Sequence, residues 1–112
     1  MARRRQPDSC GFGSAMAVIG GKWKATILWE LHDHPRRFGE LRRRVAGISE
    51  KILIEQLREM EADGLLCRRS FGGKVLHVEY SVTPLGLSLN DAVHAMAEWG
   101  RAHAVRPIAC PN

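Results

Sequence analysis

Apolar residues recur every three or four positions through the first half of the chain, which is the spacing of an amphipathic helix. The pattern predicts four helices, over residues 14–20, 22–33, 38–45 and 50–63. Ser14 and Ser49 are placed to cap the first and the fourth, because a serine hydroxyl accepts a hydrogen bond from a backbone N–H group of the first turn. Residues 46–48 have the length of the turn that joins the two helices of a helix-turn-helix pair.

The same spacing assigns an inner and an outer face to each helix. In the second helix, Trp23, Ile27 and Leu31 recur four residues apart, and Lys24 and Glu30 fall on the side expected to face water. The fourth helix has a narrow inner stripe, formed by Leu53, Leu57 and Met60.

After Leu65 the apolar period changes to two, which is the period of a β-strand. Residues 66–71 and 75–82 are predicted to form two strands, joined by a short hairpin connection at Gly72-Gly73-Lys74. Thr83 is a suitable cap for a last helix over 84–103, since Pro84 is favoured at the first helical position.

The last helix carries a long apolar stripe, made of Leu85, Leu89, Ala92, Val93, Met96 and Trp99. This stripe has more apolar surface than a small three-helix core is expected to cover. A chain of 112 residues also buries a modest share of its surface, so a subunit interface would add useful burial. We therefore expect a homodimer held together by the terminal helices, at about 14–20 and 84–103.

Three helices, a two-stranded hairpin and a closing helix are the element order of a winged helix-turn-helix domain. The predicted class is α+β, mainly α, with one domain over residues 1–112 and a DNA-binding core over about 22–82. This architecture suits duplex DNA, because a helix fits the major groove and a hairpin wing can lie on the sugar-phosphate backbone.

The charge of the chain supports a polyanionic partner. The sequence has 17 Lys and Arg against 12 Asp and Glu, a net charge of +5. Basic proteins bind nucleic acid partly by releasing counterions from phosphates. The positive residues cluster at 3–5, 36–44 and 68–74, and the last two clusters flank the predicted recognition helix, 50–63, in sequence. Double-stranded DNA is therefore the expected partner.

Other functional classes have less support in the sequence. No apolar run approaches the ~20 residues of a membrane span, and the basic N-terminus does not lead into the apolar segment of an export signal, so we expect a cytoplasmic protein. Three scattered cysteines and five histidines without ligand spacing indicate no metal and no cofactor. An enzyme would need a converging catalytic set, for which Cys10 and a distant histidine are the only raw material. A protein-interaction module on a winged-helix scaffold is the stronger alternative.

A series of short segments resembles the HxlR-type regulators, a MarR-like branch of bacterial winged-helix proteins. These segments are Cys10 and residues 19–24, 35–41, 47–49, 57–65 and 78–86. The resemblance implies a homodimer that binds DNA at operators and, in several members, a cysteine-based response to oxidants or electrophiles. It also leaves room for a small-molecule effector. Ile54 departs from the family pattern, which usually has a small hydroxyl residue there, and this bears on the operator sequence.

The candidate DNA contacts come from three predicted elements: the first helix of the pair, the recognition helix and the wing. They are Arg36, Arg37, Arg42, Arg43, Ser49, Lys51, Ile54, Glu55, Arg58, Arg69 and Lys74. A Lys or Arg side chain can donate to guanine, and a Glu side chain can accept from cytosine. The alternative is a solvated helix face without a ligand.

Cys10 and Cys110 are the candidates for redox sensing. Cys10 lies just before the first helix and follows Arg3 to Arg5, and both positive charge and a helix N-terminus activate a thiol. Cys110 lies just beyond the last helix. If the terminal helices cross in a dimer, the two cysteines of different subunits could approach to disulfide distance. The alternatives are a mixed disulfide of Cys10 with a small thiol, and an inert, half-buried Cys10 without a sensing role.

Overall fold

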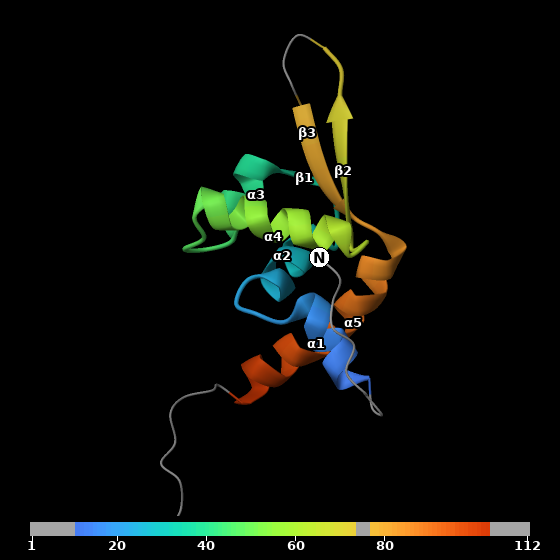
Figure 1. Ribbon diagram of the computed structural model, residues 1–112. Helices are drawn as coiled ribbons and strands as arrows, with labels where there is room; N and C mark the ends of the chain where they lie inside the picture. The colour runs from blue at the N-terminus through green and yellow to red at the C-terminus, as the bar shows by residue number, and fades with distance from the viewer. Residues whose placement is uncertain (1–10, 74–76, 104–112) are drawn as a thin grey trace, which may run out of the picture.

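The computed structural model describes residues 11–73 and 77–103. These residues form five helices and a three-stranded antiparallel sheet, so the predicted α+β, mainly α class is confirmed (Figure 1). In chain order the elements are α1 (Phe12–Ile19), α2 (Lys24–Leu31), β1 (Arg36–Arg37), α3 (Phe38–Arg44), α4 (Glu50–Ala62), β2 (Leu66–Phe71), β3 (His77–Val82) and α5 (Pro84–His103).

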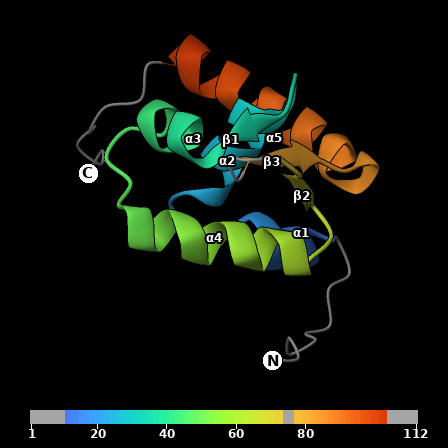
Figure 2. The same cartoon turned by 90° about the horizontal axis from the view of Figure 1, so that it is seen from above.

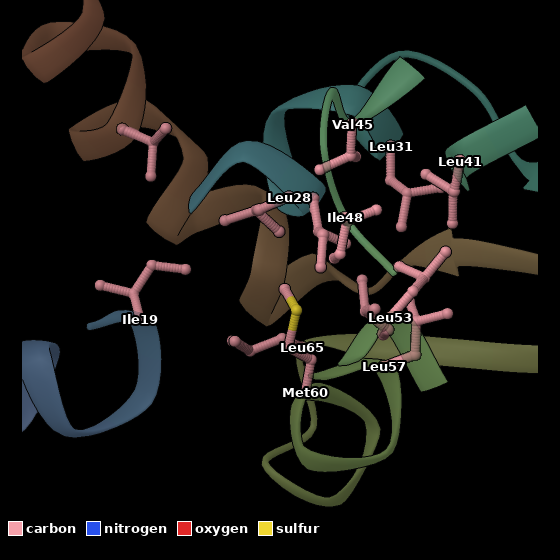
Figure 3. Packing of buried hydrophobic residues seen from close by; sticks show 13 residues of the cluster. Ile19, Leu28, Leu31, Leu41, Val45, Ile48, Leu53, Leu57, Met60 and Leu65 are labelled. Carbon is pink, nitrogen blue, oxygen red and sulfur yellow. The ribbon is translucent and has the colours of Figure 1, made fainter. Parts of the chain in front are cut away.

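One buried apolar cluster joins α1, α2, α3, α4 and α5 (Figure 3). Its members are Ile19, Ile27, Leu28, Leu31, Leu41, Val45, Ile48, Leu53, Leu57, Met60, Leu65, Leu66 and Val93. Each side chain of this size contributes about 1.5–3 kcal/mol when it leaves water. The predicted stripe of the fourth helix is buried in this core together with Ile27 and Leu31 of the second, whereas Trp23 is only partly buried and packs against the cluster.

Two helix starts differ from the sequence predictions. The first helix begins at Phe12, with Gly11 as its N-cap, and the Gly11 carbonyl oxygen accepts from the Ala15 N–H at 3.1 Å. Ser14 lies inside this helix, so its prediction as the cap is wrong. The second helix begins at Lys24 and ends at Leu31, shorter at each end than predicted.

The sheet contains a strand that the periodicity did not predict. The two residues of β1 pair with β3, with Arg36 opposite Tyr80 and Arg37 opposite Glu79. A strand of two residues is too short to show an alternation. The predicted hairpin is confirmed, with β2 over Leu66–Phe71 and β3 described from His77 onward.

The start of α5 is fastened to the end of α4. The Thr83 side-chain oxygen accepts from the Gly86 N–H at 3.0 Å, which confirms Thr83 as the cap. The Thr83 hydroxyl also lies within donating distance of the carbonyl oxygens of Gly64, at 2.6 Å, and Leu65, at 3.1 Å. A Cβ atom on Gly86 would collide with the Leu65 carbonyl oxygen, so the backbones meet here without a side chain between them.

The arrangement of the elements leaves α4 accessible on one side of the body. Figure 2 shows α4 along one side and α5 along the opposite side, with α2 and α3 between them. The hairpin of β2 and β3 extends away from the helices (Figure 1). Over residues 11–73 and 77–103, no helix combines the length and the apolar character needed to cross a lipid bilayer.

Candidate DNA interface

The turn between α3 and α4 orients the two helices of the pair. Gly47 lies in this turn with φ of 84°, a left-handed conformation that glycine adopts without steric cost. Ser49 then caps α4, because its hydroxyl oxygen accepts from the Ile52 N–H at 3.1 Å. The predicted cap is confirmed, and the Ser49 hydroxyl is committed to the helix start, at the end of α4 nearest the turn.

The helix α4 has two chemically distinct faces. Leu53, Leu57 and Met60 are buried, as their spacing predicts. Lys51, Glu55 and Arg58 are exposed, and Ile54 beside them is partly exposed. The exposed side chains share one side of the helix because residues three, four and seven positions apart lie above one another. We call Lys51, Ile54, Glu55 and Arg58 the outer face of α4.

The basic residues around α3 lie at the surface, with one exception. Arg37, Arg42 and Arg43 are exposed. The Arg42 guanidinium is 3.5 Å from the Glu50 carboxylate at the start of α4, an exposed ion pair that phosphate could compete for. Arg44 pairs with Glu30 at 2.6 Å, and this hydrogen bond raises the pKa of Arg44. Arg44 is therefore engaged with α2.

Arg36 has a structural environment, at odds with the DNA contact that the sequence predicts for it. Only 6% of the residue is exposed. Its Nε donates to the Glu30 carbonyl oxygen at 2.5 Å, and its Nη1 donates to the Glu40 carboxylate at 3.2 Å. A third contact, 3.7 Å long, joins Nη2 to Asp33. The guanidinium thus ties β1 to α2 and α3 and is not available to a phosphate.

The wing presents arginines on both faces of its hairpin. Arg68 and Arg69 are exposed neighbours in β2, so their side chains point to opposite sides of the sheet. Arg69 lies opposite Glu79 of β3, whose carboxylate is 2.8 Å from the His77 ring nitrogen. Lys74, the predicted contact at the tip, lies outside the described residues.

Sequence reasoning missed an ion pair between α2 and α4. Lys24 was expected to face water, and this prediction is wrong because the residue is 7% exposed. Its Nζ is 2.6 Å from the Glu59 carboxylate, near the end of α4. The apolar period alone cannot find such a pair, since the two residues are far apart in the sequence and each resembles an ordinary surface charge.

The described residues contribute little to a redox or metal site. Cys67, in β2, is an exposed free cysteine. Cys10 and Cys110, the predicted sensors, lie outside the described residues. Within the described ranges, no three His, Cys, Asp or Glu side chains gather where they could hold a metal ion.

The helix pair, the antiparallel wing and the charged outer face of α4 define a winged helix-turn-helix protein. The HxlR-like helix-turn-helix family model matches residues 18–107, and the chain belongs to this family. Its resemblance to the HxlR-type regulators is thereby confirmed.

The relatives are transcriptional regulators. The chain is 43% identical over 101 residues to the HTH-type transcriptional regulator YkvN of Bacillus subtilis, covering 90% of this chain and 86% of YkvN. The redox regulator HypR is similar in its reduced form, at 39% identity and a TM-score of 0.79 over 82% of this chain and 91% of HypR. A protein from Enterococcus faecalis V583, assigned to the MarR family, has 38% identity and a TM-score of 0.77 over 92% and 94% of the two chains. The chain is a helix-turn-helix transcriptional regulator and not an enzyme.

Proposed function

We propose that this regulator is a cytoplasmic homodimer that binds operator DNA in a sequence-specific manner, with α4 in the major groove. The observation that carries the proposal is the outer face of α4. Its charged side chains stand opposite a stripe that the core buries completely, so the face is presented to a partner without loss of packing. Exposed arginines of α3 and the wing lie on other elements and suit backbone phosphates.

Each part of the domain has its own task in this proposal. Lys51 and Arg58 donate to base edges, Glu55 accepts from them, and Ile54 makes apolar contact in the groove. Arg37, Arg42 and Arg43 bind phosphates beside α4, and Ser49 contributes to DNA binding at the start of the helix. Arg69 and Lys74 bind phosphates from the wing. The DNA-binding core comprises residues 22–82 of a single domain.

The exposed side of α5 supports dimerisation. Leu85, Met96 and Trp99 lie on one side of the helix and are each more than half exposed, as is Phe12 of α1. Val93, also in the predicted stripe, is buried in the core instead. Exposed apolar surface of this kind is typical of a subunit interface. A second copy of the chain is the proposed occupant, which sets two recognition helices about 34–36 Å apart, or a multiple of that, on DNA.

A thiol switch is the proposed form of regulation, with Cys10 as the sensor and Cys110 of the other subunit as its partner. The likeness to HypR, a redox regulator that is similar in both its reduced and its oxidised form, supports this proposal. Oxidation followed by non-reducing electrophoresis and a DNA-binding measurement tests it. If Cys10→Ser loses DNA affinity on oxidation as the parent protein does, Cys10 is not the sensor. If the parent and Cys110→Ser respond alike, Cys10 acts without Cys110.

A small-molecule effector would have a place between α2 and α5. A cavity of about 330 Å³ opens there. Its lining is mostly apolar and consists of Ala25, Thr26, Trp29, Val93, Met96, Ala97 and Arg101. Because Met96 also belongs to the proposed subunit interface, a ligand in this cavity would act on the dimer.

Binding to DNA at two salt concentrations tests the main proposal. The protein is titrated onto its own promoter region and onto random DNA of equal length. We expect tighter binding to the promoter, and affinities for both DNAs that fall steeply with salt, since each phosphate contact releases counterions. A protein-interaction module, the alternative on this scaffold, would show no preference for the promoter and weak binding to both.

A further inference from the structure

We propose that Lys24 is a positioning residue for DNA recognition, which acts by holding Glu59 and thereby fixing the orientation of α4. This inference rests on the proposed role of α4 as the recognition helix. It assigns a task to a lysine that lies on another helix and contacts no DNA.

The burial of the pair is unequal, and this decides which partner positions the other. The Lys24 side chain is 8% exposed and the Glu59 side chain 55% exposed, with Nζ and carboxylate oxygen 2.6 Å apart. Lysine is rarely buried unless it is paired. Since the stem of Lys24 is fixed by the packing around α2, its ammonium is a fixed point to which the more exposed Glu59 carboxylate is drawn.

Glu59 occupies a position from which it controls the outer face. It lies between exposed Arg58 and buried Met60, and one turn beyond Glu55. A tether at this position opposes rotation of α4 about its own axis, which would move Arg58 relative to a base edge. The ammonium also offsets a second carboxylate beside Glu55, which would otherwise repel DNA phosphates.

The start of α2 is an unusual place for a lysine. Lys24 is the first residue of α2, and no acidic residue lies in the first turn. A positive charge at a helix N-terminus is disfavoured by the helix dipole, so local preference does not explain Lys24. The Glu59 carboxylate compensates for both the ammonium and the helix end.

Trp23, the residue before Lys24, lies near the turn at the other end of α4. The Trp23 ring reaches to 4.0 Å from the place where a Cβ atom on Gly47 would lie, in the turn before α4. Two consecutive residues, Trp23 and Lys24, thus lie beside the turn that precedes α4 and beside the last part of α4 itself. This arrangement is suited to hold a helix in one orientation.

A set of charge-matched variants tests the inference. Lys24→Met keeps the length of the side chain and removes the ammonium, and Arg101→Met removes the same charge from the exposed last turn of α5. We expect Lys24→Met to lower affinity for the promoter about tenfold, which corresponds to about 1.4 kcal/mol, and affinity for random DNA much less. Arg101→Met should leave the ratio of the two affinities unchanged, and Lys24→Arg should retain the preference for the promoter.

A double-mutant cycle shows whether Lys24 acts through Glu59. Glu59→Gln should reduce the promoter preference as Lys24→Met does, and the double variant should lose no more than either single variant, because both remove the same contact. If Lys24→Met fails to fold, Glu59→Gln decides the matter alone, since Glu59 is more exposed.

Two outcomes separate this inference from the proposed function. If Lys24→Met and Glu59→Gln lower the melting temperature but leave the ratio of promoter to random affinity unchanged, Lys24 is a structural residue and the inference is overturned. If replacing the charged residues of the outer face together, in the variant Lys51→Ala/Glu55→Ala/Arg58→Ala, also leaves that ratio unchanged, α4 is not the recognition helix and the proposed function itself fails.

Discussion

The helices α4 and α5 are both amphipathic, but they expose opposite chemistry. In α4, the apolar stripe of Leu53, Leu57 and Met60 is buried and the charged face is exposed. In α5, the buried residues are Gly86, Asn90 and Val93, while Met96 and Trp99 stay in contact with water. The core of the subunit therefore covers the apolar stripe of α4 and leaves the apolar side of α5 exposed.

In the proposed function, this difference separates the helix face that binds DNA from the helix side that binds a second subunit. A helix whose apolar stripe is already covered can change its outer residues with little effect on folding, because surface substitutions usually cost little. A helix with an exposed apolar side needs a partner to remove that surface from water. Substitutions on the two helices should therefore differ in their consequences for stability, assembly and DNA binding.

Truncation of the α4 stripe should have the largest effect on stability. Leu57→Ala leaves a cavity in a fully packed region, so we expect the free energy of unfolding to fall by about 2–5 kcal/mol. Urea titration measures this loss, which should be similar at all protein concentrations. Leu85→Ala, the same change on the exposed side of α5, should matter only at concentrations where dimers form. Equal losses of unfolding free energy for Leu57→Ala and Leu85→Ala at low protein concentration would contradict this difference between α4 and α5.

Charges on the apolar side of α5 should dissociate the dimer. The variant Met96→Glu/Trp99→Glu places two carboxylates at the proposed interface, and we expect the dimer dissociation constant to rise at least about a hundredfold, or about 2.7 kcal/mol. Sedimentation velocity at micromolar concentration measures it. Leu87→Glu is the matched control, since Leu87 is an exposed apolar residue on the other side of α5. An unchanged sedimentation coefficient for the double variant would refute this interface.

Substitutions on the outer face of α4 should change recognition without unfolding the protein. Arg58→Ala or Lys51→Ala should weaken binding to the promoter by about 1–3 kcal/mol, the value of a lost bidentate base contact, and random DNA less. Fluorescence anisotropy with both DNAs measures the difference. If both affinities fall equally, these residues contact the backbone and not the bases.

Removal of a wing arginine should have the smallest effect. Arg69→Ala should weaken binding to promoter and random DNA alike, and reduce the slope of log affinity against log salt by about one. Arg101→Ala serves as the control, because it removes an equal charge from the last turn of α5, the end remote from the Thr83 junction, where no DNA contact is proposed. A salt slope that both variants lower equally would indicate a general effect of net charge.

The sequence predicted the elements that depend on repeated local signals. The stripe of α4, its Ser49 cap and the Thr83 start of α5 each have a local signature, a period or a capping residue, and the structure confirms them. Ser14 failed as a cap because Gly11 begins the helix three residues earlier. Serine and glycine are both accepted at this position, so the choice between them depends on the surrounding chain.

Two of the features that sequence missed, the strand β1 and the Lys24–Glu59 pair, join residues distant in the chain, whereas Arg36 contacts residues three to six positions away. The strand β1 exists because β3 pairs with it, and Arg36 is buried because Glu30, Asp33 and Glu40 surround it. In the sequence, Lys24 resembles an ordinary surface lysine, and only the folded structure places it against Glu59 of α4. Charged residues in a helical pattern are assigned to the surface by default, and only tertiary structure reveals which of them are enclosed.

The junction at Thr83 and Gly86 gives the protein the mechanics of a lever. The helix α5 has 20 residues and is therefore about 30 Å long, and its near end is fastened to the backbone at the end of α4. Because Val93, halfway along α5, is buried in the core, the helix turns together with the rest of the subunit, and a rotation of a few degrees displaces its far end by a few ångströms. In the proposed dimer the relation also works in reverse: a small displacement imposed on the far end of α5 becomes a change in the angle between two recognition helices.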